Sequence, residues 1–87
     1  MKHYVYTLKS QSTNWIYIGM TNNLERRLYQ HQHGQSRSTA PYRPFCLLFS
    51  EEYEDSLTAR NREKYLKTAA GKRFIRKKYA REINNCI

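Results

Sequence analysis

The sequence has 87 residues, enough for one compact domain and too few for two. Its 16 Lys and Arg residues against 7 Asp and Glu give a formal net charge of +9, which favours nucleic acid as the partner over a basic protein without a specific polyanion. Hydrophobic residues make up 39% of the chain, which argues against a disordered tail, and no apolar run approaches the ~18–20 residues of a membrane span. We therefore expect a folded domain in the cytoplasm, not attached to a membrane.

The first half of the chain predicts a β-hairpin followed by a helix. HYVYTLKS (His3–Ser10) and WIYIG (Trp15–Gly19) are rich in β-branched and aromatic residues, and the polar residues between them suit a turn. Helical periodicity begins after residue 21, with Asn22 as the expected N-cap and Glu25 reaching back to it. Gly34 is expected to end this helix after about residue 33.

The second half predicts one strand and two helices. PFCLLFSEEY (Pro44–Tyr53) reads as a strand whose continuous apolar middle implies burial on both faces. A helix from Asp55 or Ser56 to about Ala69 is broken at Gly71, and another covers residues 72–83. The order β-β-α-β-α-α predicts an α+β fold with a small antiparallel sheet, in one domain of residues 1–83 with a short tail at 84–87.

The cysteines carry little information at this level. Cys46 and Cys86 are too few and too far apart in the sequence to suggest a zinc site or a disulfide framework. Cys46 lies in an apolar run, so we expect it to be a small buried hydrophobic residue.

Two polar residues fall on the apolar side of the first helix. At 100° per residue, Leu24 and Leu28 lie roughly 40° apart, His31 shares their sector, and Arg27 lies at its edge one turn below His31. Arg26 points away into solvent. A single arginine in this place often lies along apolar surface with its head in water, which is the structural alternative to a role in a site.

The second predicted helix carries a carboxylate in the same kind of place. Ala59, Leu66 and Ala70 form its apolar stripe, and Glu63 falls within roughly 40–60° of all three. Because an ionised carboxylate is costly to bury alone, Glu63 is expected to bind a metal, to pair with Arg27, or to lie at a solvated edge beside Lys67.

Alternation along the strands places tyrosines near these residues. If the hairpin pairs as predicted, Tyr6 and Tyr17 point to one side of the sheet, either as aromatic core or as part of a site. Gly19 ends the second strand, where a close backbone approach or a turn needs glycine. A guanidinium, a carboxylate, an imidazole and two phenols around one pocket would suit phosphodiester cleavage.

These residues resemble a known family in their order and spacing. YVY (Tyr4–Tyr6), YIG (Tyr17–Gly19), and NLERRLYQH with Arg27 and His31 are similar to the motifs of the GIY-YIG nuclease superfamily, in particular its small single-domain bacterial-type members. RPFCLLFSEEYEDSLTARNREKYLK also resembles that family, so the resemblance covers nearly the whole chain.

The resemblance implies a three-stranded antiparallel sheet flanked by helices, and metal-dependent cleavage of DNA. Tyr6, Tyr17, Arg27 and His31 match the catalytic positions, and Gly19 matches the structural glycine. Glu63 matches the metal-binding glutamate, which would hold Mg²⁺ or Mn²⁺ with waters completing the ion's shell. The general base would be Tyr6, Tyr17 or His31, and the residues do not choose among them.

The sequence departs from the family pattern at three points. Tyr4 stands where the first half-motif usually opens with glycine, and Met20 stands where some members carry a lysine proposed as general base. A late asparagine of several family enzymes has only Asn84 and Asn85 as candidates, and both lie in the expected tail. We also expect no separate targeting domain of the kind that many members carry, and therefore low sequence specificity.

DNA would be held mainly through its phosphates. Six cationic residues are expected to contact them, from the loop before the third strand and from the last helix: Arg37, Arg43, Lys72, Arg73, Arg76 and Lys77. The first hypothesis is a DNA endonuclease acting on branched or damaged DNA, for example in repair, with a possible partner protein that supplies specificity. The second is a nucleic-acid-binding module with the same fold and no turnover. The third, a basic structural protein, does not explain the inward Arg27 and Glu63.

Overall fold

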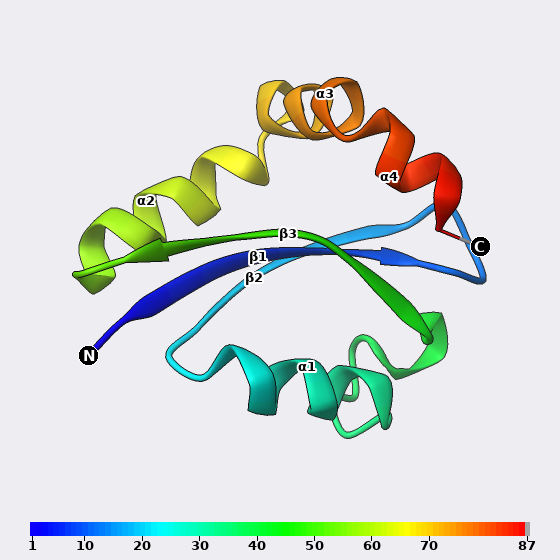
Figure 1. Ribbon diagram of the computed structural model, residues 1–87, viewed down its shortest axis with the longest axis horizontal. Coiled ribbons are helices and arrows are strands. Elements are labelled where there is room, and N and C mark those ends of the chain that lie inside the picture. Colours follow the sequence, from blue (N-terminus) through cyan, green and yellow to red (C-terminus); the bar gives the residue numbers. More distant parts are fainter. Residues whose placement is uncertain (87) are drawn as a thin grey trace.

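The computed structural model describes residues 1–86, in which a three-stranded antiparallel sheet lies between two layers of helices (Figure 1). The helix α1 and the loop after it cover one face, and α2, α3 and α4 cover the other. The expected α+β fold is confirmed. The elements in chain order are β1 (His3–Ser10), β2 (Ile16–Thr21), α1 (Leu24–Gln32), a 3₁₀ turn (Ala40–Tyr42), β3 (Phe45–Tyr53), α2 (Ser56–Leu66), α3 (Ala69–Lys78) and α4 (Ala80–Asn85).

The strand order β2-β1-β3 makes β1 the central strand and leaves two edges. In the β1–β2 hairpin Tyr6 pairs with Gly19 and Leu8 with Tyr17, so these side chains share the face covered by α1. The alternate residues Val5 and Ile18 face the other way. The hairpin and the common face of the two tyrosines are therefore confirmed.

Each face of the sheet has its own hydrophobic core. On the α2 side the buried members are Val5, Ile18, Leu48, Ala59, Leu66 and Ile75. On the α1 side Tyr6, Leu8 and Phe45 are buried, and Trp15, Tyr17, Leu24, Leu28 and Tyr42 pack against them. The second core is largely aromatic, and its tyrosines belong to the candidate site.

Prediction and structure differ slightly at the start of α1. The side chain of Asn23, not Asn22, accepts the hydrogen bond from the backbone N–H of Arg26 at 3.1 Å. Asn23 has the extended φ of −143° that a cap needs, while Asn22 is one residue too early. At the other end Gly34 adopts φ +72°, so the predicted stop is confirmed.

The expected burial of β3 on both faces holds only in part: Phe45 is buried on the α1 side and Leu48 on the other, but Leu47 is not buried. Leu47 pairs with Leu8 on the α1 side, yet 44% of its surface is exposed. Because β3 is an edge strand, its residues on this face lie partly beyond the cover of α1. The register also shifts between Thr7 and Leu8, where β1 meets β3.

The predicted boundary between the last helices is wrong. The helix α2 ends at Leu66, and Thr68 caps α3. Gly71 lies within α3 instead of breaking a helix. A Cβ at Gly71 would collide with the backbone of Tyr65 and Leu66, so glycine is needed where α3 crosses the end of α2. Ala70 consequently belongs to α3 and is exposed, outside the stripe expected for α2.

The predicted helix over residues 72–83 is interrupted. Tyr79 ends α3 and begins α4, which continues through Asn84 and Asn85 into the segment expected to be a tail. The last residue of that expected tail lies outside the described residues. Ile75 is fully buried, and Tyr79 and Ile83 pack against the same core, as the periodicity predicted.

The two cysteines form a disulfide, contrary to the expectation from their spacing. Cys46 at the start of β3 is bonded to Cys86 after α4, with a Cα–Cα distance of 5.9 Å. Their sequence separation of 40 hides this pairing, because only the fold brings α4 back to the start of β3. The bond fixes the last helices to the sheet.

Reduction of this disulfide is expected to lower the free energy of unfolding by about 4 kcal/mol. The chain-entropy account gives this value for a closed loop of about 40 residues. Denaturant unfolding with and without dithiothreitol measures it, and a Cys46→Ser/Cys86→Ser variant serves as the control that dithiothreitol should leave unaffected. An unchanged unfolding midpoint for the wild type on reduction would contradict the assignment.

Within residues 1–86, no helix is both long enough and apolar enough to cross a membrane.

Candidate active site

Tyr6 lies at the centre of the α1 face of the sheet. Only 1% of its surface is exposed, and its hydroxyl lies 2.9 Å from Nε2 of His31. Burial and then the neighbouring Tyr17 raise the pKa of Tyr6 to about 12, although Arg27 acts in the opposite direction. Tyr6 is therefore a neutral phenol at pH 7 in the free protein.

His31 is fully buried near the end of α1. Its Nδ1 lies 2.9 Å from the hydroxyl of Thr39, so both ring nitrogens have partners. Burial and then the positive charge of Arg27 lower the pKa of His31 to about 4. The imidazole is therefore neutral at pH 7, and as a base it is weaker than an exposed histidine.

Tyr17 and Gly19 complete the floor of the site. The ring of Tyr17 lies 6.1 Å from that of Tyr6 and packs edge-on against His31 at 5.1 Å, between ring centroids. A Cβ at Gly19 would lie 2.5 Å from the hydroxyl of Tyr6 and 2.9 Å from the ring of Tyr17. Glycine is thus required here because the Tyr6 phenol occupies the space over its Cα.

Arg27 lies one turn before His31 on α1 and is half-buried. Its guanidinium donates to Oε1 of Gln30 at 3.0 Å and to Oγ of Ser36 at 3.3 Å. Burial lowers the pKa of Arg27, but the phenols of Tyr6 and Tyr17 outweigh this effect and raise it. A permanent cation therefore stands beside two phenols, whereas the neighbouring Arg26 is exposed, as the helical wheel predicted.

Glu63 comes from the other side of the sheet, on α2. Its side chain is only 16% exposed, and its carboxylate lies 3.3 Å from Nζ of Lys67, which was one of the expected alternatives. Among the described ion pairs none joins Glu63 to Arg27. The structure thus brings together Tyr6, Tyr17, Arg27 and His31, and it places Glu63 apart from them in its contacts.

The orientation of α2 shows where Glu63 lies relative to these four residues. The buried Ala59 and Leu66 face the sheet, and Arg62 and Glu63 fall on opposite flanks of that line. Arg62 reaches toward β3, where it donates to the carboxylate of Glu51 at 2.9 and 3.2 Å. Since α2 also packs across β1 and β2, Glu63 lies on the flank toward β2, the edge strand that carries Tyr17 and Gly19.

The acidic residues within residues 1–86 suit a metal site that has few protein ligands. No group of three or more His, Cys, Asp or Glu side chains that could enclose an ion occurs within residues 1–86. Mg²⁺, however, keeps several waters and is commonly bound by one or two carboxylates together with substrate phosphates. A single, mostly buried Glu63 fits that requirement, while a cage made by the protein alone is not available in this part of the chain.

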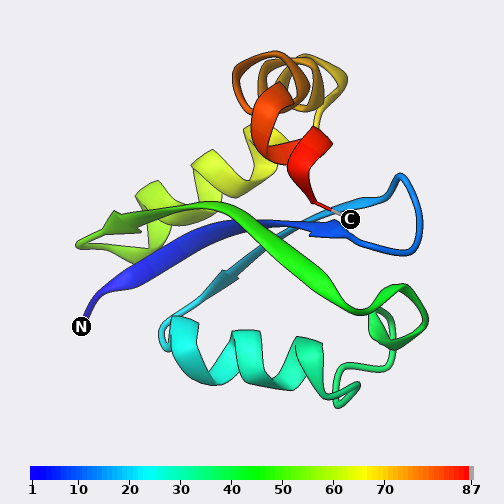
Figure 2. The same cartoon turned by 45° about the vertical axis from the view of Figure 1, so that its right-hand side comes forward.

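The six cations predicted to contact nucleic acid do not form one patch. Arg37 and Arg43 lie on the loop between α1 and β3, on the α1 face, whereas the four from α3 lie across the sheet (Figure 2). All six are exposed. Surface charge therefore covers both faces instead of concentrating on one.

The four cations of α3 fall into two pairs. Lys72 and Arg76 line a cleft of about 100 Å³ together with Asn14 and Trp15 of the hairpin, and Arg76 donates to Asn14 at 3.4 Å. Arg73 and Lys77 are not part of this cleft. The first pair is thus next to β2, the strand that also carries Tyr17.

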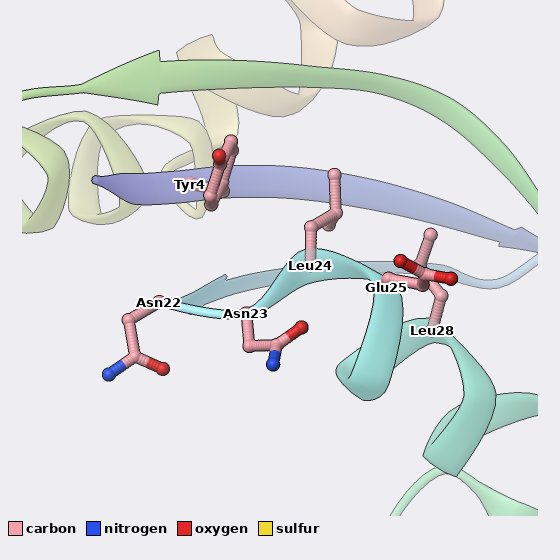
Figure 3. Close-up of a pocket in the computed structure, with 6 residues that line it drawn as sticks. All are labelled: Tyr4, Asn22, Asn23, Leu24, Glu25 and Leu28. Atoms are coloured by element: carbon pink, nitrogen blue, oxygen red, sulfur yellow. The ribbon is translucent and has the colours of Figure 1, made fainter. Parts of the chain in front are cut away.

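A hollow in the surface opens at the start of α1, beside Tyr4 on β1 (Figure 3). It has a volume of about 460 Å³. Leu24 and Leu28 form its apolar wall, while Asn22 and Asn23 point outward from it. None of the predicted catalytic residues lines this hollow, so it adds no chemistry to the site.

The sequence-based prediction missed the polar residues that hold the site. Thr39 binds His31, and Ser36 and Gln30 bind Arg27. Gln30 lies one turn from Arg27, a spacing that could have suggested the contact. Nothing in the run QSRST indicates that Ser36 and Thr39 fold back under α1.

Comparisons with known proteins bear on the family and on the fold. The model of the "GIY-YIG catalytic domain" matches residues 2–80. A "UPF0213 protein" of Clostridium perfringens is 33% identical, covering 94% of this chain and 98% of its own, and one of Staphylococcus haemolyticus is 37% identical, covering 77% and 82%. The solution NMR structure of a "UPF0213 protein" from Bacillus halodurans matches with a TM-score of 0.55 at 27% identity, covering 86% of this chain and 82% of that one.

Proposed function

The chain belongs to the GIY-YIG catalytic domain family, and on that premise we propose that it is a metal-dependent endonuclease that hydrolyses DNA phosphodiester bonds with low sequence specificity. The observation that carries the proposal is the cluster of Arg27 with the phenols of Tyr6 and Tyr17 beside the buried His31. A structural arginine would be better placed in an ion pair, but the described contacts of this guanidinium are all neutral.

Arg27 would bind the scissile phosphate. Its planar guanidinium presents paired donors that match two phosphate oxygens, and its partial burial strengthens that attraction. The neutral contacts with Gln30 and Ser36 hold the group in place without cancelling its charge. Arg27 would thereby stabilise the negative charge that develops on the phosphorus oxygens during attack.

The tyrosines would act on the attacking water and on the phosphate. Tyr6, Tyr17 and His31 remain the candidates for the general base. The low pKa of about 4 makes a free His31 a weak base, and the pKa of about 12 means that Tyr6 needs positive charge nearby to lose its proton. Arg27 supplies part of that charge.

Glu63 would hold one Mg²⁺ or Mn²⁺ at the β2 edge, with waters and substrate phosphate completing the shell. Such an ion supplies charge neutralisation at the phosphate and at the leaving oxygen. Lys67 competes for the same carboxylate and lowers its affinity for a cation in the free protein. The approach of DNA, which attracts Lys67 to its own phosphates, would favour release of Glu63.

The DNA would lie along the β2 edge, where the two faces of the sheet meet. Lys72 and Arg76 line the cleft beside this edge, and the loop that carries Arg37 and Arg43 lies on the α1 face. Contacts of this kind grip phosphates and do not read bases, which suits branched or damaged DNA and a role in repair. Any stronger specificity would come from a partner protein, and the working location would be the cytoplasm.

Cleavage of supercoiled plasmid and of branched DNA tests this function. We expect nicked products with Mg²⁺ or Mn²⁺ and none with EDTA, and restoration when the metal is added back. Wild-type protein that binds both substrates but cleaves neither in any of these metals would overturn the proposal and leave a binding module with the same fold.

The affinity for DNA is expected to fall steeply between 50 and 200 mM salt, because phosphate contacts release counterions. In a Lys72→Gln/Arg76→Gln variant the slope of log affinity against log salt should become shallower by about 2, close to one counterion for each lost contact. The matched control is Arg73→Gln/Lys77→Gln on the same helix, which should change the slope less. Equal changes in the two variants would argue against a DNA path along β2.

A further inference from the structure

A chain of buried hydrogen bonds runs from the tyrosine cluster into the loop after α1. The hydroxyl of Tyr6 lies 2.9 Å from Nε2 of His31, and Nδ1 of His31 lies 2.9 Å from Oγ1 of Thr39. The Thr39 hydroxyl in turn lies 3.3 Å from the carbonyl oxygen of Ser36. Tyr6, His31 and Thr39 are each at least 99% buried. The protein, and not the solvent, therefore determines which atom of each hydrogen-bonded pair carries the proton.

The carbonyl at the end of the chain favours one direction of the hydrogen bonds. This oxygen of Ser36 can only accept, and it also accepts from the backbone N–H groups of Thr39 and Ala40, so the Thr39 hydroxyl keeps its 3.3 Å contact there by donating its single proton. The lone pairs of Thr39 are then left for His31, which donates from Nδ1. A neutral imidazole has only one N–H, so Nε2 is unprotonated and accepts the proton of Tyr6.

We propose that Thr39 is a positioning residue, which holds His31 in the Nδ1–H tautomer and thereby turns the O–H of Tyr6 toward His31, so that the lone pairs of the phenol face away from the imidazole. If Thr39 instead donated its proton to Nδ1 of His31, its hydrogen bond to the carbonyl of Ser36 would be lost. That reversal would also turn the Tyr6 proton away from His31, although Arg27, which has donors only and so offers that proton no acceptor, is a neighbour of the phenol.

The consequence for the reaction rests on the proposed nuclease function. With its proton directed to His31, Tyr6 can accept a hydrogen bond from the attacking water and orient it. It cannot at the same time donate to a phosphate oxygen. The two phenols would therefore differ in role, because no hydrogen bond fixes the proton of Tyr17 among the described side-chain contacts.

The tautomer is measurable without any activity. Long-range ¹H–¹⁵N NMR spectra of protein labelled at histidine distinguish the protonated from the unprotonated ring nitrogen, and His3→Gln and His33→Gln variants assign the remaining signal to His31. We expect Nδ1 protonated and Nε2 unprotonated in the wild type at pH 7. A wild-type spectrum with Nε2 protonated would overturn the inference outright.

Substitutions at Thr39 extend the test. Thr39→Val removes the acceptor with little change of shape, and should raise the fraction of the Nε2–H tautomer and lower the cleavage rate about 10-fold or more, the size of effect typical of a lost orienting partner. Thr39→Ser keeps the hydroxyl and should restore both. A folded Thr39→Val protein with unchanged tautomer and rate would contradict the proposal.

The outcomes also separate this inference from the nuclease proposal. If the wild type has the expected tautomer but cleaves no DNA under any condition, the positioning role of Thr39 stands and the nuclease function fails. If the wild type cleaves DNA with the opposite tautomer, the nuclease function stands and the role of Thr39 fails.

Discussion

Replacing Arg27 with glutamine is expected to lower the rate of DNA cleavage about 10³-fold, which corresponds to about 4 kcal/mol of transition-state stabilisation. Glutamine keeps a polar side chain of similar reach, but it has no charge to place against the phosphate. Single-turnover cleavage with protein in excess over DNA measures the rate of the bond-breaking step without product release.

The neighbouring Arg26 supplies the matched control for this substitution. It carries the same charge on the same helix, but it is exposed and points away from the tyrosines. Arg26→Gln should weaken DNA binding slightly and leave the saturated rate nearly unchanged. Similar losses of rate in the two variants would mean that Arg27 contributes only general charge.

Replacing Glu63 with glutamine is expected to reduce cleavage by a similar factor, about 10³-fold, because the carboxylate is the proposed protein ligand of the metal. The loss should be partly recovered at high Mn²⁺ concentration if the main defect is metal affinity. Titrating the metal at a fixed DNA concentration separates this defect from a loss of fold, which circular dichroism would detect.

The ion pair of Glu63 with Lys67 requires its own control. The Lys67→Gln variant removes the partner at 3.3 Å but keeps the carboxylate. Because the metal no longer competes with Lys67 for the carboxylate of Glu63, this variant should need less metal for half-maximal cleavage. A loss of activity as large as that of Glu63→Gln would indicate that the ion pair, and not metal binding, is what Glu63 provides.

The sequence predicted those parts of the fold that depend on local pattern. Alternation in His3–Ser10 and the stretch ending at Gly19 predicted the hairpin, and the register then placed Tyr6 and Tyr17 on one face. The 100° spacing of α1 brought Arg27 and His31 to the same side as the tyrosines. These predictions succeeded because side-chain direction follows directly from strand and helix geometry.

The predictions that failed depend on contacts between distant parts of the chain. The close crossing of α3 over α2 requires Gly71, which by itself looks like a helix break. The bond between Cys46 and Cys86 forms only because α4 returns to the start of β3. Thr39 reaches His31 through a loop whose path no residue pattern indicates.

The position of Glu63 was predicted only in part. The wheel correctly placed it near the apolar side of its helix, and 16% exposure of its side chain agrees with that. The sequence could not tell that α2 and α1 lie on opposite faces of the sheet, which is why we propose that Glu63 and Arg27 act together around the β2 edge.

The central claim is that a metal held by Glu63 lies at the β2 edge, within reach of a phosphate bound by Arg27. Broadening of backbone amide NMR signals by Mn²⁺, in the wild type and in Glu63→Gln, tests it most directly. We expect the wild type to lose the signals of Tyr17, Gly19 and the residues around position 63 first, and Glu63→Gln to keep them. Broadening that spares β2, or that is the same in both proteins, would contradict the claim.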